Sequence, residues 1–390
     1  MIGDCFNHCA HGVSMATGAF TKLSYLRAVF RRKTRCVRAP SCPMSTAVAY
    51  CRTMRWTSVV VVCAFLLTGL GAGAWASEPV PLSDADRALF WGSPEDPIPK
   101  KLEASRRDLE GRHYMAGDEW NLHKFYEAIK NVGGGYMGVG TDQGYLFAGW
   151  MKADLAWLID YDPWVIYLHQ AYLVFFRESE TKEAFYDCWL KKSKKKSHAL
   201  LAEKLAGHPE LETLLRIFRI AQNQTYYRFL RLRRILKRAG IPSYLTDDAM
   251  YSHVRAMVLT GRLRPLRVNL LETKGMVGVA DVAKKLNVPV RAIYVSNAEG
   301  YWPYPEQYRK NMEAQFVDDK SLLLRTVPKK KRNNDYIYYA QPMSNYNEWL
   351  RQDYVHKVHD IVPRVWPRTK KHIPYLFYNE APFKRAKKRR

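Results

Sequence analysis

After residue 76 the sequence contains one cysteine, Cys188, although the whole chain of 390 residues contains seven. A single cysteine excludes an intramolecular disulfide and a zinc site built from cysteines in that part of the chain. Acidic residues are also scarce, because 37 Asp and Glu face 62 Lys and Arg, which gives a formal net charge of +25. Hydrophobic content of 47% and aromatic content of 13% exclude a disordered polypeptide and predict a sizeable core.

Several common catalytic and binding motifs are absent from the sequence. No H-x-x-x-H or clustered carboxylate pattern indicates a metal, and no G-x-S-x-G elbow indicates a hydrolase triad. No nucleic-acid-binding motif accompanies the basic residues, and no internal repeat is present. The sequence pattern therefore singles out no metal ligand and no catalytic residue.

One long apolar run is present, and it lies near the N-terminus. Arg55 precedes the run Val59–Leu67, which thins into small residues and ends in Ala74-Trp75-Ala76. This order is typical of a secretory signal peptide, so we expect a signal peptide over 54–76, cleavage after Ala76, and export to the periplasm or the exterior. The alternative is an uncleaved membrane anchor, because the run approaches the length that spans a bilayer.

Residues 1–53 precede this segment. They carry basic residues and cysteines without a clear amphipathic period. Because a signal peptide normally starts a chain, we expect the true start at Met54 or Met44, and a gene-model extension or disordered segment before it. The alternative is a long cytoplasmic tail on a membrane anchor.

The remainder of the sequence begins with a proline-rich lead-in over 77–117, which predicts one short helix over 83–90. Asp118 is predicted to cap the N-terminus of a helix over 119–131. A short apolar strand then runs into the glycine turn around Gly138 and Gly140.

Alternation of strands and helices follows and predicts an α/β fold, a doubly wound sheet over 118–345. Residues 165–262 are helical in pattern throughout, which is far more than a crossover needs and indicates a large helical insertion. A C-terminal segment, 346–390, ends in a basic tail. Further strands are predicted at 155–159, 266–271, 290–295, 321–327 and 335–340, and further helices at 144–154, 279–286 and 305–314.

Ligands of a doubly wound sheet bind beyond the carboxyl ends of the strands, so the residues that follow each strand are candidate site residues. Glycines allow the backbone to approach a ligand, and an acidic residue twenty positions beyond Gly140 is placed to accept hydrogen bonds from ribose hydroxyls. The alternatives are a tight turn without a ligand for the glycines and a cap or solvated turn for the polar residues. The candidates are Gly138, Gly140, Thr141, Asp142, Asp160, Glu272, Ser296 and Asn297.

The order of these candidates resembles the class I S-adenosylmethionine-dependent methyltransferase fold. The stretch 134–143 with Tyr161-Asp162-Pro163 further resembles an uncharacterised family of exported bacterial proteins, known from leptospires and myxobacteria, over about residues 118–345. The sequence departs from the methyltransferase pattern at Tyr136, where an acidic residue is usual, and at Asp142, where a third glycine is usual. The resemblance implies a Rossmann-like sheet that holds S-adenosylmethionine, with Gly138 and Gly140 beside it, Asp160 on the ribose, Glu272 on the adenine and Asn297 near the reacting centre.

Two functions follow from these features. The first is an S-adenosylmethionine-binding enzyme that transfers a methyl or related group, which conflicts with export because the cofactor is cytosolic. The second is a non-catalytic exported protein whose basic surface contacts anionic lipid, lipopolysaccharide or cell-wall polymer. The basic runs are 191–196, 226–238 and 384–390, and their alternative role is a solvated surface that keeps the protein soluble.

Overall fold

The structure is a computed structural model that describes residues 79–390 except 103–109, 329–334, 370 and 385–390. The described residues belong to one compact unit. The expected signal peptide over 54–76, the segment 1–53 and most of the basic tail lie outside the described residues. Within the described part of the chain, no helix combines the length and the apolar character needed to cross a membrane.

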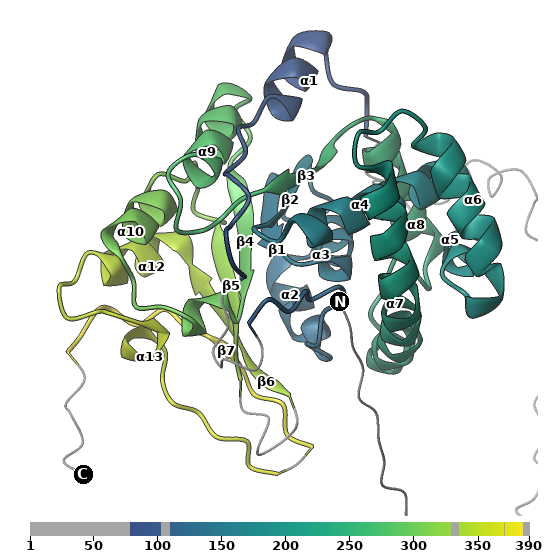
Figure 1. The fold of residues 1–390 in the computed structure, drawn as a ribbon. Coiled ribbons are helices and arrows are strands. Elements are labelled where there is room, and N and C mark those ends of the chain that lie inside the picture. Colours follow the sequence, from purple (N-terminus) through teal and green to yellow (C-terminus); the bar gives the residue numbers. More distant parts are fainter. Residues whose placement is uncertain (1–78, 103–109, 329–334, 370, 385–390) are drawn as a thin grey trace, which may run out of the picture. The chain divides into compact units, whose positions relative to one another are not determined.

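A seven-stranded, mostly parallel sheet forms the centre of the unit, with the order β3-β2-β1-β4-β5-β6-β7 (Figure 1). Strands β1 to β5 are parallel, β6 is antiparallel to β5, and β7 is parallel to β6. The strand order reverses between β1 and β4, so a topological switch point lies at their carboxyl ends. The strands are β1 (Gly135–Val139), β2 (Leu155–Asp160), β3 (Leu263–Arg267), β4 (Val290–Ser296), β5 (Leu322–Pro328), β6 (Tyr336–Pro342) and β7 (Tyr375–Phe377).

Helices cover both faces of this sheet, because successive side chains of each strand point to opposite sides (Figure 1). Tyr136 and Leu158 face one core, whereas Met137 and Trp157 face the other. The first core is covered by α2 (Tyr126–Ile129), α3 (Asp142–Met151), α4 (Pro163–Glu178), α5 (Lys182–Cys188), α6 (Lys194–Lys204), α7 (Leu211–Ala239) and α8 (Asp248–Leu259). The second is covered by α1 (Asp84–Trp91), α9 (Gly275–Lys285), α10 (Glu306–Glu313), α12 (Met343–Leu350) and α13 (Val358–Ile361).

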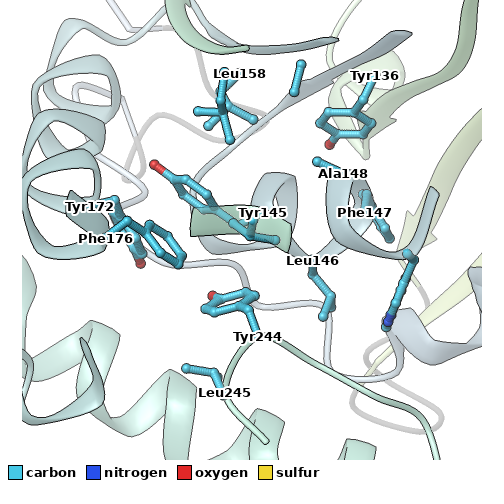
Figure 2. Close-up of a cluster of buried hydrophobic side chains, with 14 of the residues drawn as sticks. Tyr136, Tyr145, Leu146, Phe147, Ala148, Leu158, Tyr172, Phe176, Tyr244 and Leu245 are labelled. Atoms are coloured by element: carbon cyan, nitrogen blue, oxygen red, sulfur yellow. The ribbon is translucent and has the colours of Figure 1, made fainter. Parts of the chain in front are cut away.

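The first core is rich in aromatic side chains, which fix α4 against α3 (Figure 2). The rings of Tyr145 and Tyr172 stack with centroids 4.9 Å apart, and Phe176 lies 5.1 Å from Tyr145. Aromatic pairs of this kind contribute about 0.5–1.5 kcal/mol beyond their buried area. This packing sets the position of α3, and therefore of the loop that joins α3 to β1.

Most of the predicted elements are confirmed. The strands at 155–159, 290–295, 321–327 and 335–340 are present, and the region between β2 and β3 is helical without a strand, as predicted for 165–262. The C-terminal segment adds α12, α13 and β7, the last of which lies at the edge of the sheet beside β6.

The predicted strand at 266–271 is wrong in position, because β3 spans Leu263–Arg267. The predicted strand starts directly after Pro265, and proline cannot donate a ladder hydrogen bond. Strand β3 pairs with β2 alone and lies at the edge of the sheet, where the missing N–H of Pro265 leaves no partner unsatisfied. The strand therefore includes the proline and ends four residues earlier than predicted.

The predicted helix over 119–131 is also wrong in its first part. The segment forms a 3-10 turn, Leu122–Phe125, followed by α2, and Asp118 does not cap it. The reason is that Glu119 and Trp120 are engaged elsewhere: the Glu119 side chain accepts a hydrogen bond from Ser296, and Trp120 stacks under Arg231. These contacts hold the chain before residue 121 in a non-helical conformation.

Candidate functional site

The loop after β1 is held from two sides at Gly140. Its N–H donates to Asp160 Oδ2 at 3.1 Å, and its carbonyl oxygen lies 3.0 Å from His169 Nε2. His169 is buried on α4, and burial lowers its pKa to about 4, so the neutral ring donates to Gly140 and accepts from Tyr145 at 2.9 Å. Gly140 also has a φ of +96°, a backbone conformation that favours glycine. His169 was not predicted, because nothing local in the sequence links it to the loop.

Asp160 lies at the carboxyl end of β2, as predicted, and is half-buried. Its second oxygen accepts from the backbone N–H of Asp162 at 3.0 Å. Loss of hydration, together with the charge of Asp162, raises the pKa of Asp160 to about 7, although hydrogen bonds from the backbone oppose this rise. The carboxyl group is therefore close to its titration point near neutral pH and remains partly open to a ligand.

The spaces beside the two glycines are filled by the protein's own side chains. A Cβ at Gly138 would collide with the hydroxyl of Tyr136, and a Cβ at Gly140 would collide with the amide of Gln143. The Gln143 amide donates to the carbonyl oxygen of Val139 at 3.3 Å. In the described structure the glycines thus make room for Tyr136 and Gln143, which is the tight-turn alternative stated above.

Asp142 forms a buried ion pair with Arg228 of α7, with 2.8 Å between Oδ2 and Nε. Both side chains are almost fully buried. Asp142 Oδ1 also accepts from the backbone N–H of Gly117 at 3.2 Å and from Thr141 Oγ1 at 3.3 Å. Asp142 therefore joins the loop to α7 and to the lead-in, and its charge is neutralised by Arg228.

Residues 113–121, which we call the strap, cross the carboxyl ends of the strands. At β2, His113 Nδ1 lies 2.9 Å from the carboxylate of Asp162, and its ring stacks on Trp164 at 3.7 Å with an interplanar angle of 1°. At β1, Gly117 donates to Asp142. The strap therefore first crosses the ends of β2 and β1, the two strands that carry Asp160 and the glycines.

The strap continues over β4 and reaches β6. The Glu119 side chain accepts from Ser296 Oγ, and the Glu119 carbonyl oxygen accepts from Arg228 Nη1 at 2.6 Å. The backbone N–H of Asn121 donates to Tyr338 at 2.9 Å. Burial and then the charge of Asp118 raise the pKa of Glu119. The inner part of the switch-point crevice is therefore lined and covered by the chain itself.

Ser296 and Asn297 lie at the end of β4, the neighbour of β1, as predicted. Ser296 has a φ of +53°, which is unusual for a residue with a side chain and turns its hydroxyl toward Glu119. Asn297 Oδ1 lies 3.4 Å from the Ser296 hydroxyl. Ser296 therefore joins the strap to the sheet, and Asn297 contacts Ser296.

Glu272 does not follow β3 directly, because the strand ends at Arg267. Its carbonyl oxygen accepts from Asn311 at 2.7 Å. Asp96 of the lead-in occupies this end of the sheet instead, where its buried carboxylate accepts from the backbone N–H groups of Asn269, Lys274 and Gly275 at 2.9, 3.2 and 3.0 Å. The structure therefore brings seven of the eight candidates to the ends of β1, β2 and β4 and leaves Glu272 apart.

Comparison with known protein families places the chain in one of them. The model of a family described as a domain of unknown function, DUF7790, matches residues 114–373, more than half of the chain. The chain belongs to the DUF7790 family. No curated protein matches the sequence. The matched range contains nearly all of the strap, the glycine loop, Asp160 and α7, so these features lie within the DUF7790 domain.

Two surface hollows of the DUF7790 chain lie away from the strand ends. One, of about 520 Å³, lies between α10 and α12 and is lined by Arg309 and Arg351 among others. The other, of about 890 Å³, lies at the C-terminal end of α7. Four cationic side chains, Lys182, Arg233, Arg234 and Lys237, line it together with the apolar residues Leu230, Ile241 and Pro242. In the described part of the chain, no cluster of three or more His, Cys, Asp or Glu side chains is placed to hold a metal.

Helix α7 of the DUF7790 domain has an outer face that combines charge with apolar side chains. Its inner face is buried, with Phe229, Leu232 and Leu236 in the core as predicted. On the outer face Ile220, Tyr227 and Leu230 are 45%, 60% and 41% exposed. The exposed cations on this helix are Arg216, Arg219, Arg234, Lys237 and Arg238, and no acidic residue follows Glu212 within it.

Proposed function

We propose that this DUF7790 chain binds anionic lipid surfaces through the outer face of α7. The observation that carries the proposal is the exposure of Tyr227 and Leu230 on one side of a basic helix. With 29 residues the helix is about 43 Å long, which presents a row of contacts to a flat surface. Single exposed apolar side chains are common, but three on one basic helix face match the pattern of helices that lie at a membrane surface.

The apolar residues favour lipid over lipopolysaccharide sugars or a cell-wall polymer. A soluble polyanion needs cations alone, whereas a bilayer surface also accepts apolar side chains between its headgroups. Each Lys or Arg near an anionic bilayer contributes about 1 kcal/mol. The hollow at the end of α7 supports the same function, because Arg233, Arg234 and Lys237 line it beside apolar residues and suit a phosphate headgroup with its glycerol. Its fourth cation, Lys182, is paired with Asp248, and Asp247 also lines the hollow.

Vesicle co-flotation tests this proposal with the full chain. The chain is expected to float with phosphatidylglycerol vesicles and not with phosphatidylcholine vesicles. Replacing Arg234, Lys237 and Arg238 by Gln removes three exposed cations and should weaken binding about a hundredfold. The matched control replaces Lys284, Lys285 and Lys320, which are exposed outside α7, and should leave binding within about threefold of the unmutated chain. Equal losses in both variants would contradict a role for α7.

A second candidate function is the binding of an adenosyl-type ligand such as S-adenosylmethionine at the strand ends, on a Rossmann-like, methyltransferase-like fold. The observation that favours it is Asp160, a half-buried carboxylate at the switch point beside Gly140. We expect the ribose side of such a ligand to bind at this carboxylate. The methionine side does not fit, because Tyr136, Gln143 and the strap fill that part of the crevice. We therefore propose binding at this edge and assign no residue to methyl transfer.

Calorimetric titration with S-adenosylhomocysteine tests the second candidate. Hydrogen bonds from both ribose hydroxyls to a carboxylate contribute roughly 1.5–3 kcal/mol, so Asp160→Ala should weaken binding about tenfold to a hundredfold. Asp281→Ala, at an exposed carboxylate on α9, is the matched control and should have no effect. Equal affinities of the unmutated chain and Asp160→Ala would refute the assignment of Asp160 to the ribose.

A further inference from the structure

The strap lies where a ligand of the switch-point crevice would lie. It contacts the residues that follow β2, β1 and β4 in turn, through His113, Gly117 and Glu119. Each of these contacts is polar, and each uses a group that could instead face a ligand. The strap is thus a segment of the chain that supplies polar partners to the residues at the strand ends, in place of a ligand.

Strap residue Gly117 lies against buried polar side chains of this inner space. A Cβ at this position would lie 3.1 Å from Arg228 Nη2, 3.1 Å from Gln143 Oε1 and 3.3 Å from Glu119 Oε2. Arg228 Nη2 and Gln143 Oε1 are buried and have no hydrogen-bond partner among the described residues. The hydroxyl of Tyr136 is also buried and without a partner in that part of the chain. Buried polar groups are normally paired, so these groups are free to take a water molecule or a polar ligand as a partner beneath the strap.

The strap is attached mainly by polar contacts, which a ligand can replace. Among its residues Met115 and Glu119 are buried, whereas Tyr114 is exposed and the others are half-buried. One apolar anchor is little for a segment of nine residues, because burial of apolar surface is the main source of stability for a packed segment. Its remaining contacts are hydrogen bonds, the stacking of His113 on Trp164 and the stacking of Trp120 under Arg231, which water or a ligand can replace.

We infer that the strap is a built-in competitor for the crevice: an adenosyl-type ligand binds only when residues 113–121 leave the ends of β1 and β4. The inference rests on the second candidate function and adds its regulation. The apparent affinity of such a ligand is the intrinsic affinity multiplied by the fraction of molecules in which the strap is open. Anything that loosens the strap therefore tightens binding, although it adds no contact to the ligand.

Two substitutions open the strap without changing Asp160, Gly138 or Gly140. Gly117→Val places methyl groups against Arg228 and Gln143, where even a Cβ is tight. His113→Ala removes both the contact to Asp162 and the stacking on Trp164. Controls of the same chemistry are Gly300→Val, where no atom lies within 4 Å of the added Cβ, and His356→Ala, at an exposed histidine.

The experiment combines amide hydrogen exchange over 113–121 with calorimetric titration of S-adenosylhomocysteine, on the full chain. Both strap variants should exchange these amides at least tenfold faster than the unmutated chain and bind the probe at least tenfold more tightly, whereas the controls change neither. Faster exchange with unchanged affinity would overturn the competition and leave the adenosyl site standing. Faster exchange without any binding would overturn the site and the competition together.

The unmutated chain supplies a readout that does not depend on the variants folding. Saturating S-adenosylhomocysteine should speed exchange at the amides of Gly117 and Asn121, because the bound ligand holds the strap away from Asp142 and Tyr338. Ligand binding that slows exchange at these amides would contradict the inference, since the strap would then close over the ligand instead of making way for it.

Discussion

At the scale of single residues, the carboxyl groups at the strand ends are distinguished by what neutralises them. Asp142 has Arg228 as a buried partner, whereas Asp160 is held by backbone N–H groups alone. Hydrogen bonds from the backbone do not fully offset the loss of hydration, so the pKa of Asp160 rises to about 7. A polar ligand that donates two hydrogen bonds would supply the missing stabilisation.

Titration of Asp160 makes the stability of the fold depend on pH. Because the pKa of Asp160 is about 7 in the folded chain and 3.8 is its ordinary value, the folded state holds a proton that the unfolded state releases. Stability therefore falls as pH rises from about 4 to 7 and levels off above that range, by about 1–3 kcal/mol after allowance for partial exposure. In Asp160→Asn this contribution is absent, so the stability difference between the two proteins should change with pH in that window.

Urea unfolding followed from pH 4 to 8 measures this difference. The exposed Asp281→Asn substitution on α9 is the control and should run parallel to the unmutated chain. Parallel curves for Asp160→Asn as well would mean that Asp160 titrates in the ordinary range and is well hydrated.

At the scale of elements, the sequence predicted the strands and helices whose formation depends on nearby residues. The buried strands β2, β4, β5 and β6 are runs of apolar and aromatic residues, and α7 shows a clear helical period. Strand β3 was misplaced because its tolerance of Pro265 depends on its being at an edge, which no local pattern reveals. Asp160 was predicted for the same local reason that β2 was, since it directly ends a buried strand.

The strap could not be predicted, because its contacts join residues far apart in the sequence. His113 meets Asp162 across 49 positions, Glu119 meets Arg228 across 109, and Asn121 meets Tyr338 across 217. A helix over 119–131 with Asp118 as its cap was predicted because the sequence does not reveal these distant partners. The glycine pattern was equally ambiguous, since a ligand and the side chains of Tyr136 and Gln143 require the same small residue.

A prediction at this scale separates the two faces of α7. The Arg231 guanidinium lies 3.7 Å from the centroid of the Trp120 ring, so Arg231→Gln should lower stability by about 0.5–1 kcal/mol. Arg234 is exposed, so Arg234→Gln should leave stability within about 0.5 kcal/mol of the unmutated value and weaken binding to phosphatidylglycerol vesicles. Thermal unfolding and vesicle titration of both variants check this. The reverse assignment of the two effects would contradict the orientation of α7.

At the scale of the whole molecule, we propose that the chain is exported and that its N-terminal segment is removed. The proposal comes from the apolar run and the sequence Ala74-Trp75-Ala76. N-terminal sequencing of the protein from its native host should give Ser77 as the first residue, and fractionation should place the protein outside the cytoplasm. A cytoplasmic protein that still carries residues 54–76 would contradict export and would favour the S-adenosylmethionine-dependent candidate.

Export and the surface of α7 fit one account: a DUF7790 domain whose crevice is filled by its own strap and whose contacts with other molecules are made by a basic, partly apolar helix. In this account charge and apolar burial act together. Charge attraction weakens with salt, because the screening length falls to about 10 Å at 0.1 M ionic strength. The contribution from burial of Tyr227 and Leu230 is not screened in this way.

The most direct measurement is therefore the affinity of the full chain for phosphatidylglycerol vesicles at low and high salt, with and without the double substitution Tyr227→Ser and Leu230→Ser. The account predicts that high salt weakens binding of the unmutated chain without abolishing it, and that the double variant binds at low salt but not at high salt. Binding that is independent of salt, or a double variant that matches the unmutated chain at both salt concentrations, would contradict it.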